Sequence, residues 1–317
     1  MNNPSSIAFL FPGQGSQTVG MGKELAQNYG VARQTFEEAD DALGYKLSQL
    51  CFEGPEEKLK LTEITQPAIL TTSVAALRVL REKGMEADYV AGHSLGEYSA
   101  HVAAGTLSFA DAVRTVRNRG RYMQEAVPVG VGAMAAILGL PADKVTEICV
   151  DAAQAEVCQA ANINSPEQIV ISGHAGAVER AVKLAHERGA KKAISLPVSA
   201  PFHCALMQAA QDRLAGDLQS PEFRNPARPV VCNVDAAPVD SAEASRDALV
   251  RQVTGSVRWD PSVRWLIEKG VGLFVEVGPG KVLWGLMRQI DRSKTCTTVG
   301  DEASLQKTLG QMAGTAA

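Results

Sequence analysis

Short apolar runs alternate with longer segments of helical periodicity over the first 126 residues of the chain. Residues 7–11 and 89–91 are apolar runs of strand length, whereas apolar side chains recur at helical spacing over residues 71–83 and 109–126. After Pro201 the helix and strand patterns return, ending in an apolar run at 273–277, a Gly-Pro-Gly turn and a helical segment. This alternation predicts an α/β domain with a mostly parallel sheet.

The pattern changes between residues 130 and 198, where strands and helices follow the order strand, helix, strand, strand, helix, strand. This order is typical of a ferredoxin-like unit. We therefore expect a large α/β domain, made of residues 1–126 and 199–317, that is interrupted by a small ferredoxin-like subdomain at residues 127–198. The six elements expected in the small subdomain are residues 133–138, 142–153, 157–162, 168–172, 175–188 and 192–198.

Composition and charge exclude several classes of protein. Of the 317 residues, 45% are hydrophobic and 21% are charged, which is ordinary for a compact globular protein. The net charge of −4 argues against a nucleic-acid partner, because such proteins usually carry a basic excess. The six cysteines form no C-x-x-C pair, the chain starts without a secretory pattern, and residues 7–11 are far shorter than the roughly 20 needed to cross a membrane. We expect a cytoplasmic protein with no membrane partner.

The pentapeptide GHSLG at residues 92–96 fits the G-x-S-x-G pattern of a nucleophile elbow. An apolar run precedes it and a helical pattern follows it, which is the context that an elbow requires. The glycines would permit a tight turn that exposes the Ser94 hydroxyl at a helix N-terminus. The alternative is that Ser94 only caps a helix.

The standard α/β-hydrolase fold fits badly, because only one convincing strand precedes this serine. The chain also lacks the H-G-G-G oxyanion segment of that fold. Instead, the first apolar run leads into the glycine-rich loop PGQGSQ at residues 12–17. An oxyanion hole would therefore have to be built in another way.

His203 is the best candidate for a general base, since it follows the junction where the small subdomain returns to the large one. Ligand sites often lie between domains. A lone histidine is nevertheless more often a surface or capping residue, and this alternative stays open. The neighbouring Cys204 is interpreted as a small core residue rather than a reactive thiol.

Arg119 shares the apolar stripe of the helix predicted at residues 109–126, three residues after Val116 and seven after Ala112. A buried guanidinium needs a partner. Either a substrate carboxylate or an internal Asp or Glu could serve, because the planar fork of arginine suits a carboxylate. The other arginines of this helix are expected on its solvated face.

Two further glycine-rich segments are not cofactor sites. GVGAMA at residues 130–135 follows a helix and leads into a strand, which is the reverse of a dinucleotide-binding unit, and GPGK at 278–281 lacks the spacing of a phosphate loop. No metal-ligand motif is present in the sequence. We expect neither a cofactor nor a metal.

Taken together, these segments resemble the malonyl-CoA:acyl carrier protein transacylase family, which is related to the acyltransferase domains of polyketide synthases. The resemblance covers nearly the whole chain. It is carried by FPGQGSQ at residues 11–17, GHSLGEY at 92–98, Arg119-Gly120 with Met123-Gln124, NINS at 162–165, PFHCALM at 201–207 and EVGPG at 276–280.

The resemblance implies a role for each candidate residue. Ser94 would be the nucleophile, His203 its base and Arg119 the clamp on the malonyl carboxylate. The backbone N–H groups of Gln14 and Leu95 would form the oxyanion hole. The backbone carbonyl of Gln252 would orient the histidine. Phe202 resembles the phenylalanine that precedes the histidine in malonyl-selective polyketide domains. The segment Ala200-Pro201-Phe202-His203 nevertheless departs from the tetrapeptides of those domains.

The resemblance further implies a ping-pong acyltransferase. It would move a malonyl group from malonyl-CoA to Ser94 and then to the phosphopantetheine thiol of an acyl carrier protein, and so supply fatty acid synthesis. We expect a monomer. The alternatives are a serine thioesterase or patatin-like hydrolase, in which water takes the second step, and a non-catalytic carrier-binding scaffold.

Overall fold

The computed structural model describes residues 6–198 and 200–315. Its larger sheet has six strands in the order β10-β9-β1-β2-β7-β8. Five of them run parallel and only β8 is antiparallel to its neighbour, so the prediction of a mostly parallel sheet is confirmed. The strands are β1 (Ser6–Phe11), β2 (Tyr89–Gly92), β7 (Val230–Cys232), β8 (Ala237–Val239), β9 (Val271–Val277) and β10 (Thr295–Val299).

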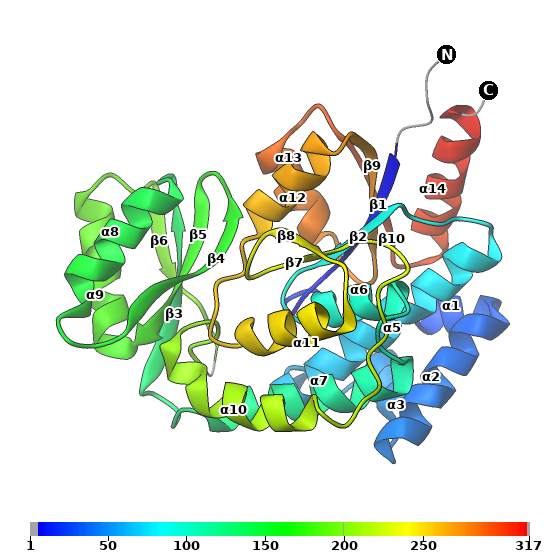
Figure 1. Cartoon of the computed structure of the whole chain (residues 1–317), viewed down its shortest axis with the longest axis horizontal. Coiled ribbons are helices and arrows are strands. Elements are labelled where there is room, and N and C mark those ends of the chain that lie inside the picture. Colours follow the sequence, from blue (N-terminus) through cyan, green and yellow to red (C-terminus); the bar gives the residue numbers. More distant parts are fainter. Residues whose placement is uncertain (1–5, 199, 316–317) are drawn as a thin grey trace.

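Alternate residues of β1 enter two different cores, because successive side chains of a strand point to opposite faces. Phe9 and Phe11 belong to the larger core, whereas Ala8 and Leu10 belong to the smaller core on the other face. Figure 1 shows the corresponding layers, with α12 (Trp259–Glu268) and α13 (Val282–Ile290) on one side of the sheet and α5 to α7 on the other.

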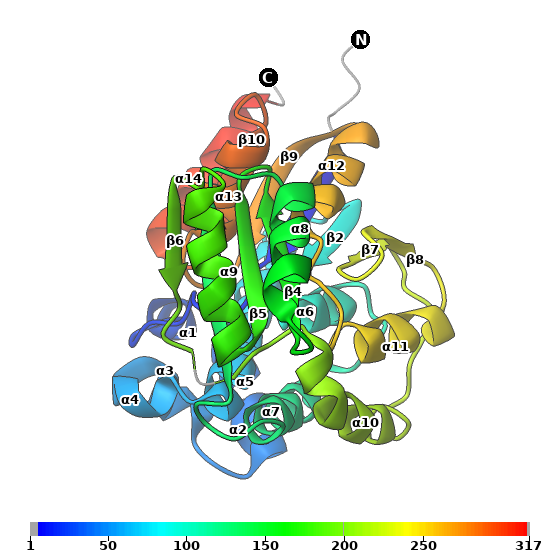
Figure 2. The same cartoon turned by 90° about the vertical axis from the view of Figure 1, so that its left-hand side faces the viewer.

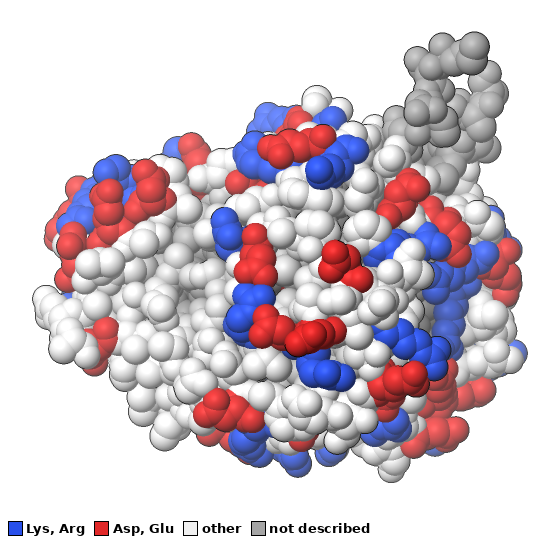
Figure 3. Space-filling model, in the orientation of Figure 1, with Lys and Arg blue, Asp and Glu red and all other residues white. Residues whose placement is uncertain are grey.

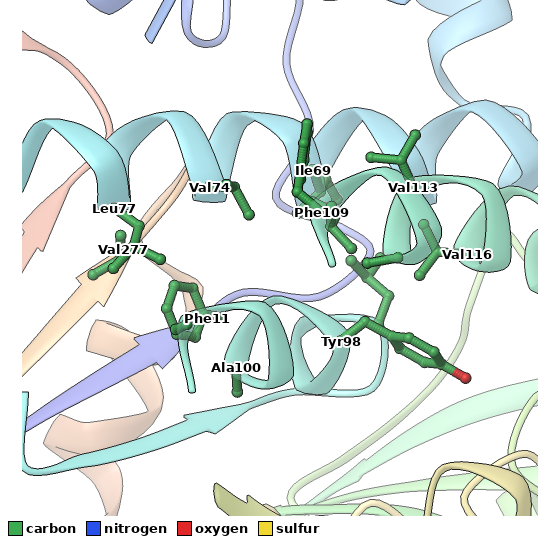
Figure 4. Close-up of a cluster of buried hydrophobic side chains, with 14 of the residues drawn as sticks. Phe11, Ile69, Val74, Leu77, Tyr98, Ala100, Phe109, Val113, Val116 and Val277 are labelled. Atoms are coloured by element: carbon green, nitrogen blue, oxygen red, sulfur yellow. The ribbon is translucent and has the colours of Figure 1, made fainter. Parts of the chain in front are cut away.

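The larger core is centred on three consecutive helices of this second layer, α5 (Thr62–Glu82), α6 (Gly96–Ala103) and α7 (Phe109–Glu125). Figure 4 shows Ile69 and Val74 of α5 facing Val113 and Val116 of α7 and Tyr98 of α6. The remaining helices of the large domain are α1 (Lys23–Asn28), α2 (Gly30–Leu43), α3 (Leu47–Glu53), α4 (Glu56–Leu59), α10 (Gln208–Asp217), α11 (Ala242–Arg251) and α14 (Glu302–Thr315), with a short 3₁₀ turn at Ala205–Met207.

The second sheet has four antiparallel strands in the order β4-β5-β3-β6. Its chain order is β-α-β-β-α-β and its strand order is that of a ferredoxin-like fold, so this part of the fold prediction is also confirmed. Both helices cover one face of this sheet (Figure 2). Its elements are β3 (Gly132–Leu138), α8 (Ala142–Ala153), β4 (Cys158–Ser165), β5 (Gln168–His174), α9 (Ala175–Glu187) and β6 (Lys192–Ser195).

The face of the small sheet that its helices leave uncovered packs against residues outside this sheet. Met134 and Val170 on this face form a small cluster with Phe202. The edge strand β4 is tied to the segment after α11 by two backbone hydrogen bonds, from Val257 N–H to the Ala161 carbonyl at 2.8 Å and from Ile163 N–H to the Val257 carbonyl at 2.9 Å. The small sheet therefore contacts the segments around Phe202 and Val257, which connect elements of the rest of the chain.

Charged side chains do not segregate by sign on the face seen in Figure 3, where acidic and basic groups are interleaved. In the described part of the chain, no helix combines the length and apolarity that crossing a bilayer would demand. The same residues contain no group of three or more His, Cys, Asp or Glu side chains arranged to hold a metal ion.

Gly120 lets α7 approach α5 closely, since a Cβ at this position would lie 2.6 Å from the Thr62 carbonyl oxygen. We expect Gly120→Ala to lower the free energy of unfolding by about 1–3 kcal/mol, because overpacking forces the two helices apart. Denaturant unfolding measures this change. The matched control is Gly216→Ala in α10, where an added Cβ meets nothing within 4 Å and should raise stability by roughly 0.5–1 kcal/mol. Equal effects of the two substitutions would contradict the argument.

Candidate active site

Ser94 lies at the sharp turn between β2 and α6. Its φ of +52° is in the left-handed region, which is rare for a residue other than glycine and marks stored strain. The flanking glycines make the turn possible. A Cβ on Gly92 would overlap the backbone of Gly96, and a Cβ on Gly96 would overlap the carbonyl of Phe11 at the end of β1. The strand-turn-helix context expected for an elbow is present.

His203 lies against the serine, with its Nε2 2.8 Å from the Ser94 Oγ. Its Nδ1 is 2.9 Å from the backbone carbonyl oxygen of Gln252. Because a carbonyl can only accept, Nδ1 must carry the proton, and the lone pair of Nε2 is left free to accept from the serine hydroxyl. The geometry is that of a base oriented by a backbone carbonyl, without an aspartate.

Burial keeps the imidazole of His203 neutral. The side chain is 4% exposed, and burial lowers its pKa to about 3, with the positive charge of Arg119 as the second cause. A neutral imidazole is the form that can accept a proton. The pair Ser94–His203 is therefore held in its reactive protonation state across the physiological range.

The Arg119 side chain is buried beside this pair and is 1% exposed. Its Nη1 donates to Gln66 Oε1 at 2.8 Å, and its Nη2 donates to Gln252 Oε1 at 2.9 Å and to the Ser94 Oγ at 3.0 Å. Among the described residues it forms no ion pair with an Asp or Glu. The sequence alone leaves an internal Asp or Glu open as the partner of Arg119. The structure instead shows two neutral amides, from Gln66 and Gln252, in contact with the guanidinium, whose charge has no direct counter-ion.

These groups line a cavity of about 140 Å³ between the two sheets. Gln14, from the loop after β1, and Phe202 line it as well. Leu95 and Gln252 are fully buried and lie behind the cavity rather than in its wall. The N–H groups of Gln14 and Leu95 donate to no acceptor in the described chain.

Several residues of the site were not predicted from the sequence. Gln66 in α5 holds Arg119, and Asn164 Oδ1 accepts a hydrogen bond at 2.8 Å from the Nε2 of His93, the residue before the serine. The opposite wall is apolar and comes from the small sheet and the segment after it. Its side chains are Met134, Val170, Leu196 and Val198. Gln66 gave no clear signal, because it lies between Thr65 and Pro67 in a part of α5 that was not predicted to be helical. The apolar side chains of the opposite wall could be recognised only once the small sheet was placed.

The neutral state of His203 has a measurable consequence. A histidine with an ordinary pKa of about 6.5 would be roughly 97% protonated at pH 5. We expect the rate at which phenylmethylsulfonyl fluoride modifies Ser94 to change little between pH 8 and pH 5, because the lowered pKa keeps the base free. A rate that falls about thirtyfold over this range would contradict the argument. His203→Ala is the control and should abolish the reaction at every pH.

Comparisons with known proteins identify the family to which the chain belongs. Residues 8–314 match the family model described as the acyl transferase domain. The chain is 50% identical over 306 residues to the malonyl CoA-acyl carrier protein transacylase of Escherichia coli, covering 96% of this chain and 99% of the relative. An acyl carrier protein S-malonyltransferase structure from Vibrio cholerae superposes with a TM-score of 0.94 at 49% identity, over 96% of this chain and all of the other.

A second similar structure holds a malonyl-transacylase in complex with a type II PKS acyl-carrier protein. It is 49% identical to this chain, with a TM-score of 0.94, and the match covers 97% of this chain and 100% of the other. The identities are high and the coverage is nearly complete in both directions. The chain therefore belongs to the acyl transferase family and, within it, to the malonyl CoA-acyl carrier protein transacylases.

Proposed function

We propose that this enzyme transfers a malonyl group from malonyl-CoA to the phosphopantetheine thiol of an acyl carrier protein through a malonyl ester on Ser94. The observation that carries the proposal is the buried guanidinium of Arg119, which lies 3.0 Å from the Ser94 Oγ and has no carboxylate partner in the described chain. An acyl group that ends in a carboxylate would supply that partner. The catalytic pair Ser94–His203 supplies the transfer chemistry.

In the first half-reaction His203 Nε2 takes the hydroxyl proton while the Ser94 Oγ attacks the thioester carbonyl carbon. The resulting imidazolium is stabilised by the Gln252 carbonyl, which keeps its hydrogen bond from Nδ1. The tetrahedral intermediate then expels the coenzyme A sulfur, which receives the proton from His203. The second half-reaction runs the same steps in reverse, with the carrier thiol as the nucleophile and its proton passing through His203 to the serine.

The oxyanion of each tetrahedral intermediate would be held by the backbone N–H groups of Gln14 and Leu95. Both come from segments whose positions the fold fixes, since Gln14 follows β1 and Leu95 precedes α6, and a preorganised donor costs no rearrangement at the moment of reaction. Each such donor typically contributes on the order of a hundredfold or more in rate. Side-chain identity matters little for this role.

Arg119 and the apolar side chains of the cavity would each contribute to the choice of acyl group. Arg119 would form a bidentate pair with the malonyl carboxylate, the geometry that a guanidinium favours. Phe202 lines the same cavity and would leave little room for an α-methyl branch. We propose selection for malonyl on these grounds.

The remaining features of the proposal concern organisation and partners. Residues 127–198 would form the small subdomain and residues 1–126 with 199–317 the large one, although residues 1–5, 199 and 316–317 lie outside the described part of the chain. We propose an enzyme that acts as a monomer in the cytoplasm and uses no cofactor of its own. The relatives named above are transacylases, so neither the hydrolase nor the scaffold interpretation gains support.

Intact-mass measurement tests the proposal most directly. Mixing the enzyme with malonyl-CoA should add one malonyl group, and adding a phosphopantetheinylated acyl carrier protein should move that group to the carrier. Ser94→Ala should form no adduct, because the nucleophile is missing. An adduct that is lost only to water would instead indicate a hydrolase, and the absence of any adduct on the unaltered enzyme would indicate a scaffold.

Removing the clamp should change which acyl group is accepted. We expect Arg119→Ala to lower kcat/KM for malonyl transfer by roughly a hundredfold, in line with the loss of a buried charge-assisted pair, while acetyl transfer is retained. Initial rates with malonyl-CoA and acetyl-CoA measure the change. Arg114→Ala is the control, since Arg114 lies on the same helix but is exposed and paired with Asp111. Equal losses for both donors would contradict the clamp.

A further inference from the structure

Asn233 is a fully buried residue that immediately follows the short strand β7 and faces the serine turn. Its side-chain Oδ1 accepts a hydrogen bond from the Ser94 backbone N–H at 2.7 Å. Its Nδ2 donates to the Gly92 backbone carbonyl, also at 2.7 Å. One amide side chain therefore holds the backbone on both sides of His93, at the residue where the chain turns out of the sheet.

These two side-chain hydrogen bonds extend the pairing of β2 with β7 by one step, past the last residues whose backbones pair with each other. Strand β2 pairs in parallel with β7 at Val90–Val230 and Ala91–Val231, and the pairing stops there. The next backbone groups of β2 belong to the turn, which bends away from a parallel ladder. The carboxamide of Asn233 offers an acceptor oxygen and an N–H donor side by side, as a peptide group does, and so it satisfies the two backbone groups that β7 cannot reach.

The Asn233 backbone is itself fixed from two directions. Its N–H donates to the buried Glu97 Oε2 at 2.8 Å, and its carbonyl accepts from the Arg258 N–H at 3.0 Å. The same Glu97 oxygen accepts from Gln252 Nε2 at 2.8 Å. Asn233 thus belongs to one hydrogen-bond network with Gln252, whose carbonyl orients His203 and whose Oε1 accepts from Arg119.

We propose that Asn233 is a positioning residue of the transfer reaction, which holds the strained turn so that the Ser94 hydroxyl meets His203 and the Leu95 N–H faces the oxyanion. The left-handed conformation of Ser94 is unfavourable by itself and persists only where the surroundings enforce it. Asn233 makes direct contact with the turn but does not line the cavity, so it acts through Ser94 and not on the substrate. The inference rests on the proposed function only for the identity of the acyl donor.

A residue that positions the nucleophile should affect all acyl groups alike. We expect Asn233→Ala to lower kcat roughly tenfold to a hundredfold for malonyl and acetyl transfer together and to leave KM nearly unchanged. The substitution removes the two hydrogen bonds to the turn and a longer one from Gln252 Nε2 at 3.4 Å. This result differs from that of the Arg119 clamp, which should act on malonyl alone. An unchanged kcat would overturn the inference.

Loss of stability must be separated from loss of positioning. The matched control is Thr308→Val in α14, which removes the hydrogen bonds of this buried hydroxyl to Thr297 Oγ1 at 2.7 Å and to the Thr298 carbonyl at 3.1 Å, both in β10. Both variants should unfold at lower denaturant concentration than the unaltered enzyme, but only the substitution at Asn233 should lower kcat at a temperature where both remain folded. A fall in kcat that follows stability equally in the two variants would overturn the proposal.

Asn233→Asp gives a second and sharper test, because only its protonated form can reproduce the amide. A neutral carboxyl group can donate to the Gly92 carbonyl and accept from the Ser94 N–H, whereas the carboxylate has lost the donor. Burial beside the Glu97 carboxylate should raise the pKa of the aspartic acid at position 233. The other charged groups around Glu97 are Arg119, which lies beyond Gln252, and the more exposed Asp235. The variant should therefore be most active at low pH and lose activity as the pH rises through that raised pKa.

The experiment compares the pH dependence of the reaction with phenylmethylsulfonyl fluoride for the unaltered enzyme, Asn233→Asp and Asn233→Ala. A loss of rate at rising pH that appears only in Asn233→Asp supports the inference, and a profile parallel to that of the unaltered enzyme overturns it, even if Asn233→Ala fails to fold. The reagent modifies Ser94 without any malonyl donor. Failure of the unaltered enzyme to transfer malonyl would thus count against the proposed function and leave this test intact.

Discussion

The left-handed backbone of Ser94 is the constraint on which the rest of the site depends. It lifts the hydroxyl out of the end of β2, places it 2.8 Å from the imidazole of His203 and starts α6 directly behind it. A strained residue persists only when its neighbours leave it no alternative. Here the neighbours are two glycines that permit close backbone contact and a buried asparagine that satisfies the freed peptide groups.

The residues that line the cavity lie far apart in the sequence, and they meet where the small sheet packs against the rest of the chain. The large parallel sheet brings the loop after β1 and the elbow after β2 to the same edge, as adjacent parallel strands do. The small sheet adds the apolar side chains of Met134 and Val170, from the face that its own helices leave uncovered, and the polar Asn162 of β4. Gln14 and Ser94 thus follow strands of the large sheet, Arg119 lies on α7, and His203 lies in the segment after β6.

Much of this arrangement could be predicted from the sequence, because its strongest elements carry periodic signals. The elements of the small sheet were found within a few residues of their observed bounds. The start of α5 was missed, since the helix begins at Thr62 and contains Pro67, a residue that usually argues against a helix interior. Asn233 gave no signal at all, because a single asparagine after the three-residue strand β7 has no period and looks like any turn residue.

The two amides that hold Arg119 have a consequence for the enzyme between its half-reactions. Gln66 and Gln252 fix the guanidinium in space but leave its positive charge uncompensated by any nearby acid in direct contact. A buried charge without a counter-ion destabilises the folded state. If Arg119 binds the malonyl carboxylate as proposed, malonylation of Ser94 would give this guanidinium the ion-pair partner that it lacks in the free enzyme.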